Sequence, residues 1–131
     1  MTALAAGDAF LCPEDWEGGR HLWIVISNPS AAEDVLIVNV SKLKGLACDD
    51  RTCVLEADSH PRINVRSCIR YDRCKKVAVK ALENVLGNEG RFTRQAPVAG
   101  EVLLRIQRAS STAPMIDPIF RALMRKQGLA L

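Results

Sequence analysis

The sequence is poor in aromatic residues and contains no repeat that would simplify its fold. Aromatic side chains make up 5% of its 131 residues, so Val, Leu, Ile and Ala must build most of the core. A platform of stacked Phe and Tyr side chains, as in RNA-recognition motifs, is therefore not expected. The length and the 48% hydrophobic content predict a single domain over residues 1–131 with one core.

The sequence also lacks the closely spaced cysteine pairs of zinc sites. It has five cysteines, an odd number, and none of them forms a C-x-x-C pair. Cys48, Cys53 and His60 could meet around a metal ion only by accident of the fold, so we expect no metal site and no cofactor. Buried free thiols in a reducing compartment explain the cysteines better, and we expect a cytoplasmic protein.

Long apolar runs are absent as well. No run approaches the roughly 18 residues that a membrane-spanning helix needs. Residues 1–6 have neither the basic start nor the apolar stretch of a secretory signal. We therefore expect no membrane partner.

Charge is present in quantity but is unevenly distributed along the chain. The net charge is +3, yet residues 1–60 carry −6 and residues 61–131 carry +9. The second segment is therefore the better candidate to meet phosphate groups. The alternative is that acidic and basic segments interleave over the folded surface and compensate one another.

Short apolar runs between polar turns predict a β-rich α+β fold. Residues 22–27 and 35–40 have the length and composition of buried strands, with no helical period between them, which favours an antiparallel pair in a small barrel. Two amphipathic helices are expected over residues 97–108 and 117–127, the second capped by Asp117 and opened by Pro118. The barrel should cover residues 7–80, with further strands at 7–12, 53–55 and 65–71 and a strand or a helix at 75–86.

The stretch from residue 53 to residue 73 holds the densest group of chemically active side chains. A polar turn at His60-Pro61 separates two apolar runs. If these runs pair as neighbouring strands, several of the active groups share one face of the sheet. The group consists of His60, Arg62, Arg66, Ser67, Arg70, Tyr71 and Arg73.

Two histidines compete for an acid–base role. His60 lies in a polar turn beside Asp58 and is expected to be exposed, and an imidazole titrates near neutral pH. His21 follows Arg20 at the entry to a strand. Either histidine could instead be structural or superficial, and the arginines of the 65–71 strand could form only its solvated face.

Four segments together form a further pattern. Its parts are a Gly-Asp start, a glycine-rich loop with Arg before an apolar strand, a strand end with a hydroxyl residue, and a Ser-bearing strand followed by Asp and Arg. They are Gly7-Asp8 with Phe10, Gly19-Arg20 with residues 22–27, Asn39-Val40-Ser41, and Ser67-Cys68-Ile69 with Asp72-Arg73. In this pattern the sequence resembles the PemK/MazF family of toxins from bacterial toxin–antitoxin systems. It departs from the family at His21, Ser41 and Arg66, where the family has Pro, Thr and Asp.

The resemblance implies a small SH3-like antiparallel barrel with C-terminal helices. It also implies a homodimeric endoribonuclease that cleaves single-stranded RNA without metal. A cognate antitoxin would neutralise it. Such cleavage needs a base, an acid and a cation that stabilises the charged phosphorane. Arg20 matches the family's loop arginine and is expected to supply the cation. The alternative function is an SH3-like module that binds nucleic acid or protein without cutting it. The candidate catalytic residues are Arg20, His60, Ser67 and His21, and the candidate RNA-binding residues are Ser41, Lys42, Arg62, Arg66, Arg70, Tyr71 and Arg73.

Overall fold

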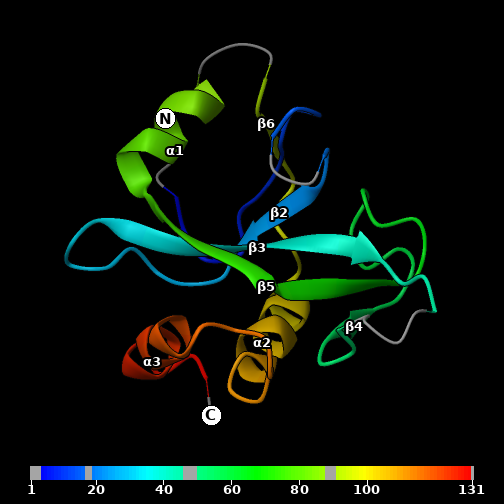
Figure 1. Cartoon of the computed structure of the whole chain (residues 1–131). Coiled ribbons are helices and arrows are strands. Elements are labelled where there is room, and N and C mark those ends of the chain that lie inside the picture. The colour runs from blue at the N-terminus through cyan, green and yellow to red at the C-terminus, as the bar shows by residue number, and fades with distance from the viewer. Residues whose placement is uncertain (1–3, 17–18, 46–49, 88–90, 131) are drawn as a thin grey trace.

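The computed structural model describes residues 4–16, 19–45, 50–87 and 91–130, and within these ranges the chain forms a six-stranded antiparallel sheet and three helices (Figure 1). The strands follow the order β4-β5-β3-β2-β1-β6 across the sheet. The predicted β-rich α+β class is therefore confirmed. The elements are β1 (Ala9–Leu11), β2 (Leu22–Val25), β3 (Asp34–Lys42), β4 (Val54–Leu55), β5 (Ser67–Ala78), α1 (Val79–Gly87), β6 (Thr93–Gln95), α2 (Gly100–Ala109) and α3 (Pro118–Lys126).

The central strands β2 and β3 form where the sequence has continuous apolar runs. All four residues of β2 are buried, and so are residues 35–40 of β3. β-Branched and aromatic side chains suit a sheet that is covered on both faces. The register pairs Leu22 with Val40 and Val25 with Ile37, which confirms the predicted antiparallel pair.

Apolar side chains form two clusters, one on each face of the sheet. The first lies between the sheet and helices α2 and α3, and it includes Ile106 and Met124. The second includes Trp23 of β2 and Leu82 of α1. Figure 1 shows α1 on one side of the sheet and α2 and α3 on the other. The helices thus cover both faces of the sheet, so the side chains of the central strands are buried on both faces.

The last helix, α3, follows the sequence signals closely. Asp117 is its N-cap, and the side-chain oxygen Oδ1 accepts a hydrogen bond from the backbone N–H of Ile119 at 2.8 Å. Pro118 occupies the first turn, where no N–H donor is needed. The helix stops before Gly128, whose φ of 75° a glycine adopts at little cost. The predicted cap and stop are therefore confirmed.

Two other expectations need adjustment. Helix α2 begins at Gly100 and not at Pro97, because the N–H of Val98 donates to the carbonyl of Gly7 and keeps this segment in an extended connection. The ambiguous segment 75–86 is both things in succession, since β5 runs to Ala78 and α1 begins at the next residue. The short strand β6 was not expected, because its sequence, Thr-Arg-Gln, carries no apolar signal.

The pairing of β3 with β5 contains a large bulge. Asn39 pairs with Arg70 and Ile37 pairs with Lys75, so that residues 71–74 of β5 lie opposite Val38 alone. A bulge bends its strand and turns side chains away from the regular alternation. It lies in the middle of β5 and includes Tyr71 and Arg73 of the stretch that the sequence marked as chemically dense.

Candidate active site

The ends of three strands meet at one edge of the sheet and enclose a hollow of about 750 Å³. β2 starts at Leu22, opposite Val40, and β3 ends at Lys42, opposite Ser67 at the start of β5. Polar residues just outside or at the tips of these strands therefore converge. The hollow is lined by Leu11, Arg20, His21, Leu22, Val40, Ser41, Lys42, Lys44, Arg62, Ile63, Asn64, Val65, Ser67, Cys68, Arg70, Asp72, Arg73 and Met115.

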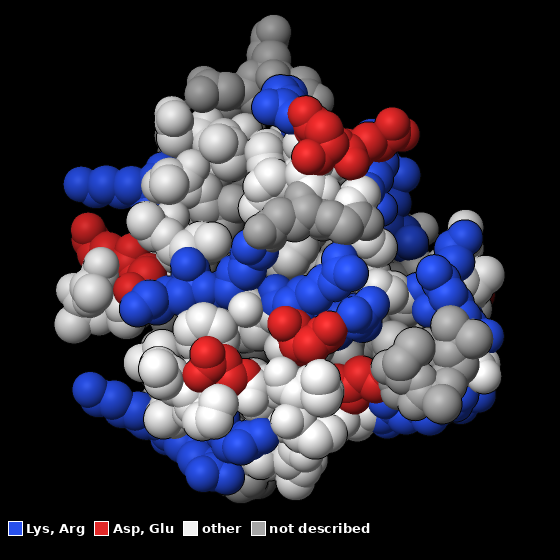
Figure 2. All heavy atoms as spheres, in the orientation of Figure 1, with Lys and Arg blue, Asp and Glu red and all other residues white. Residues whose placement is uncertain are grey.

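The lining of this hollow is strongly cationic. It contains six Lys and Arg side chains, and Asp72 is the one acidic residue among the described residues that line it. Figure 2 shows Lys and Arg side chains forming a band across the middle of the molecular face that β5 follows. A concave surface with one sign of charge concentrates ligands of the opposite sign. The hollow is thus suited to a polyanion.

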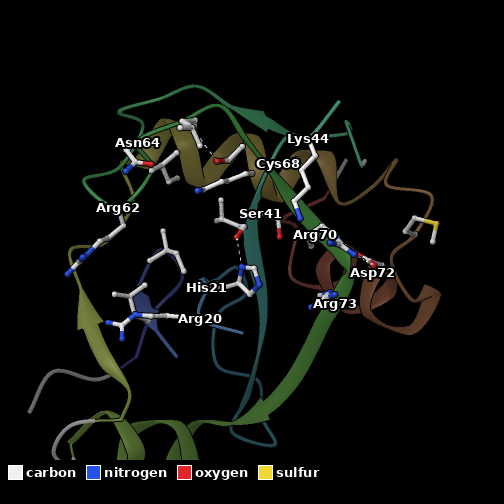
Figure 3. Close-up of a pocket in the computed structure, with 18 residues that line it drawn as sticks. Arg20, His21, Ser41, Lys44, Arg62, Asn64, Cys68, Arg70, Asp72 and Arg73 are labelled. Atoms are coloured by element: carbon white, nitrogen blue, oxygen red, sulfur yellow. Dashed lines mark hydrogen bonds and ion pairs between the residues drawn. The ribbon is translucent and has the colours of Figure 1, made fainter. Parts of the chain in front are cut away.

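Arg20 and His21 enter the hollow from the loop before β2. Figure 3 shows His21 beside Ser41, with Arg20 toward Arg62. The His21 nitrogen Nδ1 lies 3.2 Å from the carbonyl oxygen of Val40. Because a carbonyl only accepts, Nδ1 carries a proton, and in the neutral ring Nε2 is the nitrogen that can take up another. Arg20 is exposed and has no ion-pair partner among the described residues.

A buried thiol holds this loop in place. Cys12 donates from Sγ to the carbonyl of Gly19 at 3.2 Å and accepts from the N–H of His21 at 3.4 Å. Gly19 has a φ of 94°, which side chains other than glycine rarely adopt. The hydrogen bonds to Cys12 therefore fix the backbone conformation of the segment from Gly19 to His21. Gly18, which the resemblance places in the same loop, lies outside the described residues.

The opposite wall of the hollow is formed by β5 and its bulge. The Arg70 guanidinium donates two hydrogen bonds to Asp72, at 2.9 Å and 2.7 Å. These bonds and the charge of Arg70 lower the pKa of the Asp72 carboxyl below its ordinary value, although partial burial opposes the shift, and Arg73 adds to the lowering. The carboxylate is therefore charged at neutral pH and partly neutralises Arg70. Figure 3 shows Arg70, Asp72 and Arg73 in succession along this wall.

The structure brings most of the sequence-predicted site residues together. Arg20 and His21 come from the loop before β2, and Ser41 and Lys42 come from the end of β3. The Ser67 hydroxyl also lines the hollow, but it already donates to the carbonyl of Val65 at 2.9 Å. The predicted residues in the lining are Arg20, His21, Ser41, Lys42, Arg62, Ser67, Arg70 and Arg73.

His60 is not part of this lining, and the expectation that its ring is exposed is wrong. The residue is 3% exposed. Its Nε2 lies 2.6 Å from the carbonyl oxygen of Ala96, and its Nδ1 accepts from the N–H of Arg62 at 3.0 Å. The tight turn that brings Ile63 back to His60 directs the ring inward. Both ring nitrogens thus serve the backbone.

Tyr71 and Arg66 also lie elsewhere. Tyr71 is buried on the face of the sheet that α2 covers, and its hydroxyl donates to the carbonyl of Ile106 at 2.7 Å. Burial raises the pKa of the Tyr71 phenol far above its ordinary value. Arg66 is exposed and pairs with Glu56 at 2.9 Å. Neither side chain lines the hollow. Tyr71 points into the core, and Arg66 is engaged by Glu56.

Several lining residues escaped the sequence analysis. Lys44 follows Lys42 by two positions, and Asp72 adjoins Arg73, so nearness in the sequence was available as a signal. No sequence signal pointed to Asn64 or Met115. Met115 reaches the hollow through the packing of the segment between α2 and α3.

The described residues contain no cluster of three or more His, Cys, Asp or Glu side chains that could hold a metal ion. Cys48, one member of the metal alternative, lies outside the described residues. In the part of the chain that the structure describes, every helix is too short or too polar to cross a bilayer.

Fold and site together define a β-rich α+β protein with a cationic hollow where the strand ends meet. No protein-family model matches the sequence, and no curated protein sequence matches it either. The structure, however, is similar to a chain in the crystal structure of MazE-MazF (Form-II) from Deinococcus radiodurans, with a TM-score of 0.54 and 14% sequence identity over 89% of this chain and 100% of that chain. At this identity the likeness shows a common fold.

Proposed function

We propose that the protein is a MazF-like toxin, an endoribonuclease that cleaves single-stranded RNA at the cationic hollow. The observation that carries the proposal is the convergence of His21 with six cationic side chains, Arg20 among them, in one hollow. The fold similarity to a chain of MazE-MazF supports it, and so does the resemblance in sequence. In keeping with that family we further propose an SH3-like barrel, a homodimer and a cytoplasmic location.

The proposed reaction is an internal transfer at phosphorus. His21 takes the proton from the ribose 2′-hydroxyl, whose oxygen attacks the adjacent phosphorus. The bond from phosphorus to the 5′-oxygen then breaks, and that oxygen takes a proton from water, to which His21 afterwards gives up the proton that it accepted. The products are a 2′,3′-cyclic phosphate and a 5′-hydroxyl end, and no metal takes part in these steps. Arg20 and Arg73 stabilise the extra negative charge of the phosphorane.

The hydroxyl groups have smaller roles in this proposal. The Ser41 hydroxyl has no partner among the described residues, so it is available to a phosphate oxygen. Ser67, whose hydroxyl is engaged with Val65, shapes the wall. Lys42 and Arg62 at the rim contact the RNA backbone.

The proposal is tested by RNA cleavage in the presence of EDTA. We expect the wild type to cut single-stranded RNA, and Arg20→Ala and His21→Ala to lower the rate by about a hundredfold or more each. Arg108→Ala on the exposed side of α2 removes the same charge away from the hollow and should leave the rate unchanged. The enzyme proposal fails if the wild type cuts no RNA under any condition.

A second candidate function follows from two apolar side chains at the rim. Val65 is 41% exposed and Met115 is 60% exposed, and both line the hollow. A cationic hollow with an apolar rim fits an acidic, partly apolar protein segment. We therefore propose that a cognate antitoxin binds here, and binding of such a segment without any RNA cleavage would favour the non-catalytic module.

A further inference from the structure

Arg62 differs from several other arginines of the chain in the nature of its side-chain partner. Its guanidinium nitrogen Nε donates to the side-chain oxygen Oε1 of Gln95 at 2.8 Å. Gln95 belongs to β6 and lies outside the lining of the hollow, which includes Arg62. In the described part of the chain, four other arginines pair with carboxylates. These are Arg66 with Glu56, Arg70 with Asp72, Arg91 with Asp15, and Arg94 with Asp8.

An amide partner leaves the positive charge of Arg62 intact. A carboxylate neutralises an arginine, as Asp72 does for Arg70 in the same hollow. The neutral amide of Gln95 instead accepts one of the five N–H donors that a guanidinium carries. The terminal nitrogens Nη1 and Nη2 of Arg62 have no partner among the residues that the structure describes. This outer edge can bind a phosphate through two parallel hydrogen bonds.

Both the backbone and the side chain of Arg62 are tied to the end of β6. The N–H of Arg62 donates to Nδ1 of His60 at 3.0 Å, and Nε2 of His60 donates to the carbonyl of Ala96 at 2.6 Å. The Gln95 amide donates from Nε2 to the carbonyl of Thr93 at 3.4 Å, which leaves Oε1 for Arg62. A long side chain that is already held in place loses less conformational freedom when it binds a ligand.

Arg62 and Arg20 lie on the same side of the hollow. Figure 3 shows Arg20 toward Arg62, and it shows Arg70 and Arg73 on the other side. Neither Arg20 nor Arg62 pairs with a carboxylate within the described ranges of the chain. The electrostatic potential on this side is therefore positive, and a phosphate group is a ligand that it favours.

We propose that Gln95 is a positioning residue, which holds the Arg62 guanidinium so that its outer edge meets a backbone phosphate of the bound RNA. Gln95 acts through Arg62 and does not itself touch the substrate. That the ligand is RNA rests on the proposed function, whereas the hold of Gln95 on Arg62 does not. The polar strand β6 thus contributes to a hollow that Gln95 does not line.

The hold on Arg62 is tested without any ligand, by NMR of the full ¹⁵N-labelled chain. Arg62→Lys removes the Nε–H group and so assigns the signal of Arg62. We expect Gln95→Ala to speed the exchange of this proton with water several-fold, because the proton loses its acceptor. An exchange rate that stays the same in Gln95→Ala overturns the proposal.

The effect on the substrate is tested with a 2′-O-methyl hexaribonucleotide, which lacks the reacting hydroxyl. We expect Gln95→Ala to weaken its binding by about two- to tenfold, since the Arg62 side chain must then be ordered on binding. The slope of log affinity against log salt should stay the same, because the charge of Arg62 remains. Gln95→Glu places a carboxylate beside Arg62 and should reduce this slope by about 0.7. In the cleavage assay, Gln95→Ala should raise KM and leave kcat unchanged.

Thr93→Ala is the matched control. Thr93 lies two positions before Gln95 on β6, and this variant keeps the carbonyl that the Gln95 amide contacts. It should bind the hexanucleotide as the wild type does, and an equal loss in Thr93→Ala would show a general effect on the strand and overturn the proposal.

A double-mutant cycle shows whether Gln95 acts through Arg62. In an Arg62→Ala background, Gln95→Ala should cause no further loss of affinity. Additive losses would mean that Gln95 acts by another route and would overturn the proposal. If the wild type binds no oligonucleotide, the proposed function fails together with the phosphate contact, while the exchange of the Arg62 proton still decides whether Gln95 holds this side chain.

Discussion

Two histidines in one chain have opposite surroundings, although the sequence offers both as acid–base candidates. His21 is half-buried at the hollow and has one nitrogen on a backbone carbonyl. His60 is buried and uses both ring nitrogens to satisfy backbone groups. Their substitution should therefore affect different properties of the protein.

We predict that His60→Ala lowers the free energy of unfolding by about 1–3 kcal/mol, because it leaves the carbonyl of Ala96 and the N–H of Arg62 without their partner. Its cleavage rate, measured on the folded fraction, should stay within a few-fold of wild type. His21→Ala should show the reverse pattern. Urea unfolding and an RNA cleavage assay on the same samples separate the two. Loss of cleavage in a fully folded His60→Ala protein would restore His60 as a catalytic candidate.

The sequence was informative about individual residues where local chemistry decides their position. Arg20 and Lys42 adjoin strand ends, and residues at the ends of neighbouring strands converge. It failed for His60 because the direction of a side chain in a tight turn depends on a contact with Ala96, which is distant in the chain. The buried polar atoms of Asn39 and Trp23, which have no hydrogen-bond partner among the described residues, could not be predicted either, since such partners are visible only after the strands are paired.

At the scale of elements, helix α3 is the part that the sequence specifies most completely. Its N-cap at Asp117 and its stop at Gly128 are both local signals. Strand β5 is the contrary case, because its twelve residues include a bulge that no local pattern predicts. At the bulge, four residues of β5 lie opposite one residue of β3. The bulge also places Asp72 and Arg73 in the lining of the hollow.

We predict that Asp117→Ala lowers the free energy of unfolding by about 1 kcal/mol, because the N–H of Ile119 loses its acceptor. Asp117→Ser should recover most of this loss, since a serine hydroxyl also accepts at an N-cap. Thermal or urea unfolding measures both variants. Equal destabilisation by Ala and Ser would show that the charge of Asp117 matters and the cap hydrogen bond does not.

At the scale of the whole molecule, the sheet holds several buried groups that ionise only at high pH. Burial raises the pKa of the Cys53 thiol above its ordinary value of 9.0, and it raises the pKa of the Cys74 thiol to about 12. The Tyr71 phenol is shifted upward from 10.0 as well. In the unfolded chain these groups ionise at their ordinary values, so their contribution to stability is complete below about pH 9 and is lost as the pH rises.

We therefore predict that the free energy of unfolding declines from about pH 9 upward, by up to about 1.4 kcal/mol per pH unit for each group. Urea unfolding in the presence of a reductant, between pH 7 and pH 11, measures the decline. Cys74→Ala removes one titrating group and should make the decline shallower, whatever it does to stability at pH 7. An unchanged slope in this variant contradicts the assignment.

The sequence predicted the class of the fold and the central antiparallel pair, because continuous apolar runs of strand length dominate residues 22–27 and 35–40. It did not predict β6, whose residues are polar and join the sheet by pairing with β1. The cationic character of the hollow followed partly from the basic second segment of the chain. Its exact composition depends on Arg20 and Lys42 from the first segment, which only the folded sheet brings there.

The pairing of β1 with β6 has a consequence for the order in which the protein is made. Ala9 pairs with Gln95, and the carbonyl of Gly7 accepts from Val98, so β1 obtains its second neighbour long after it leaves the ribosome. By then the strands that form the hollow have already been synthesised. Helix α2, which follows β6 after a short connection, packs against one apolar face of the sheet. The nascent chain therefore holds the residues of the hollow before it can complete the sheet, and we expect ribosome-bound chains to gain activity only after residues 91–109 have emerged.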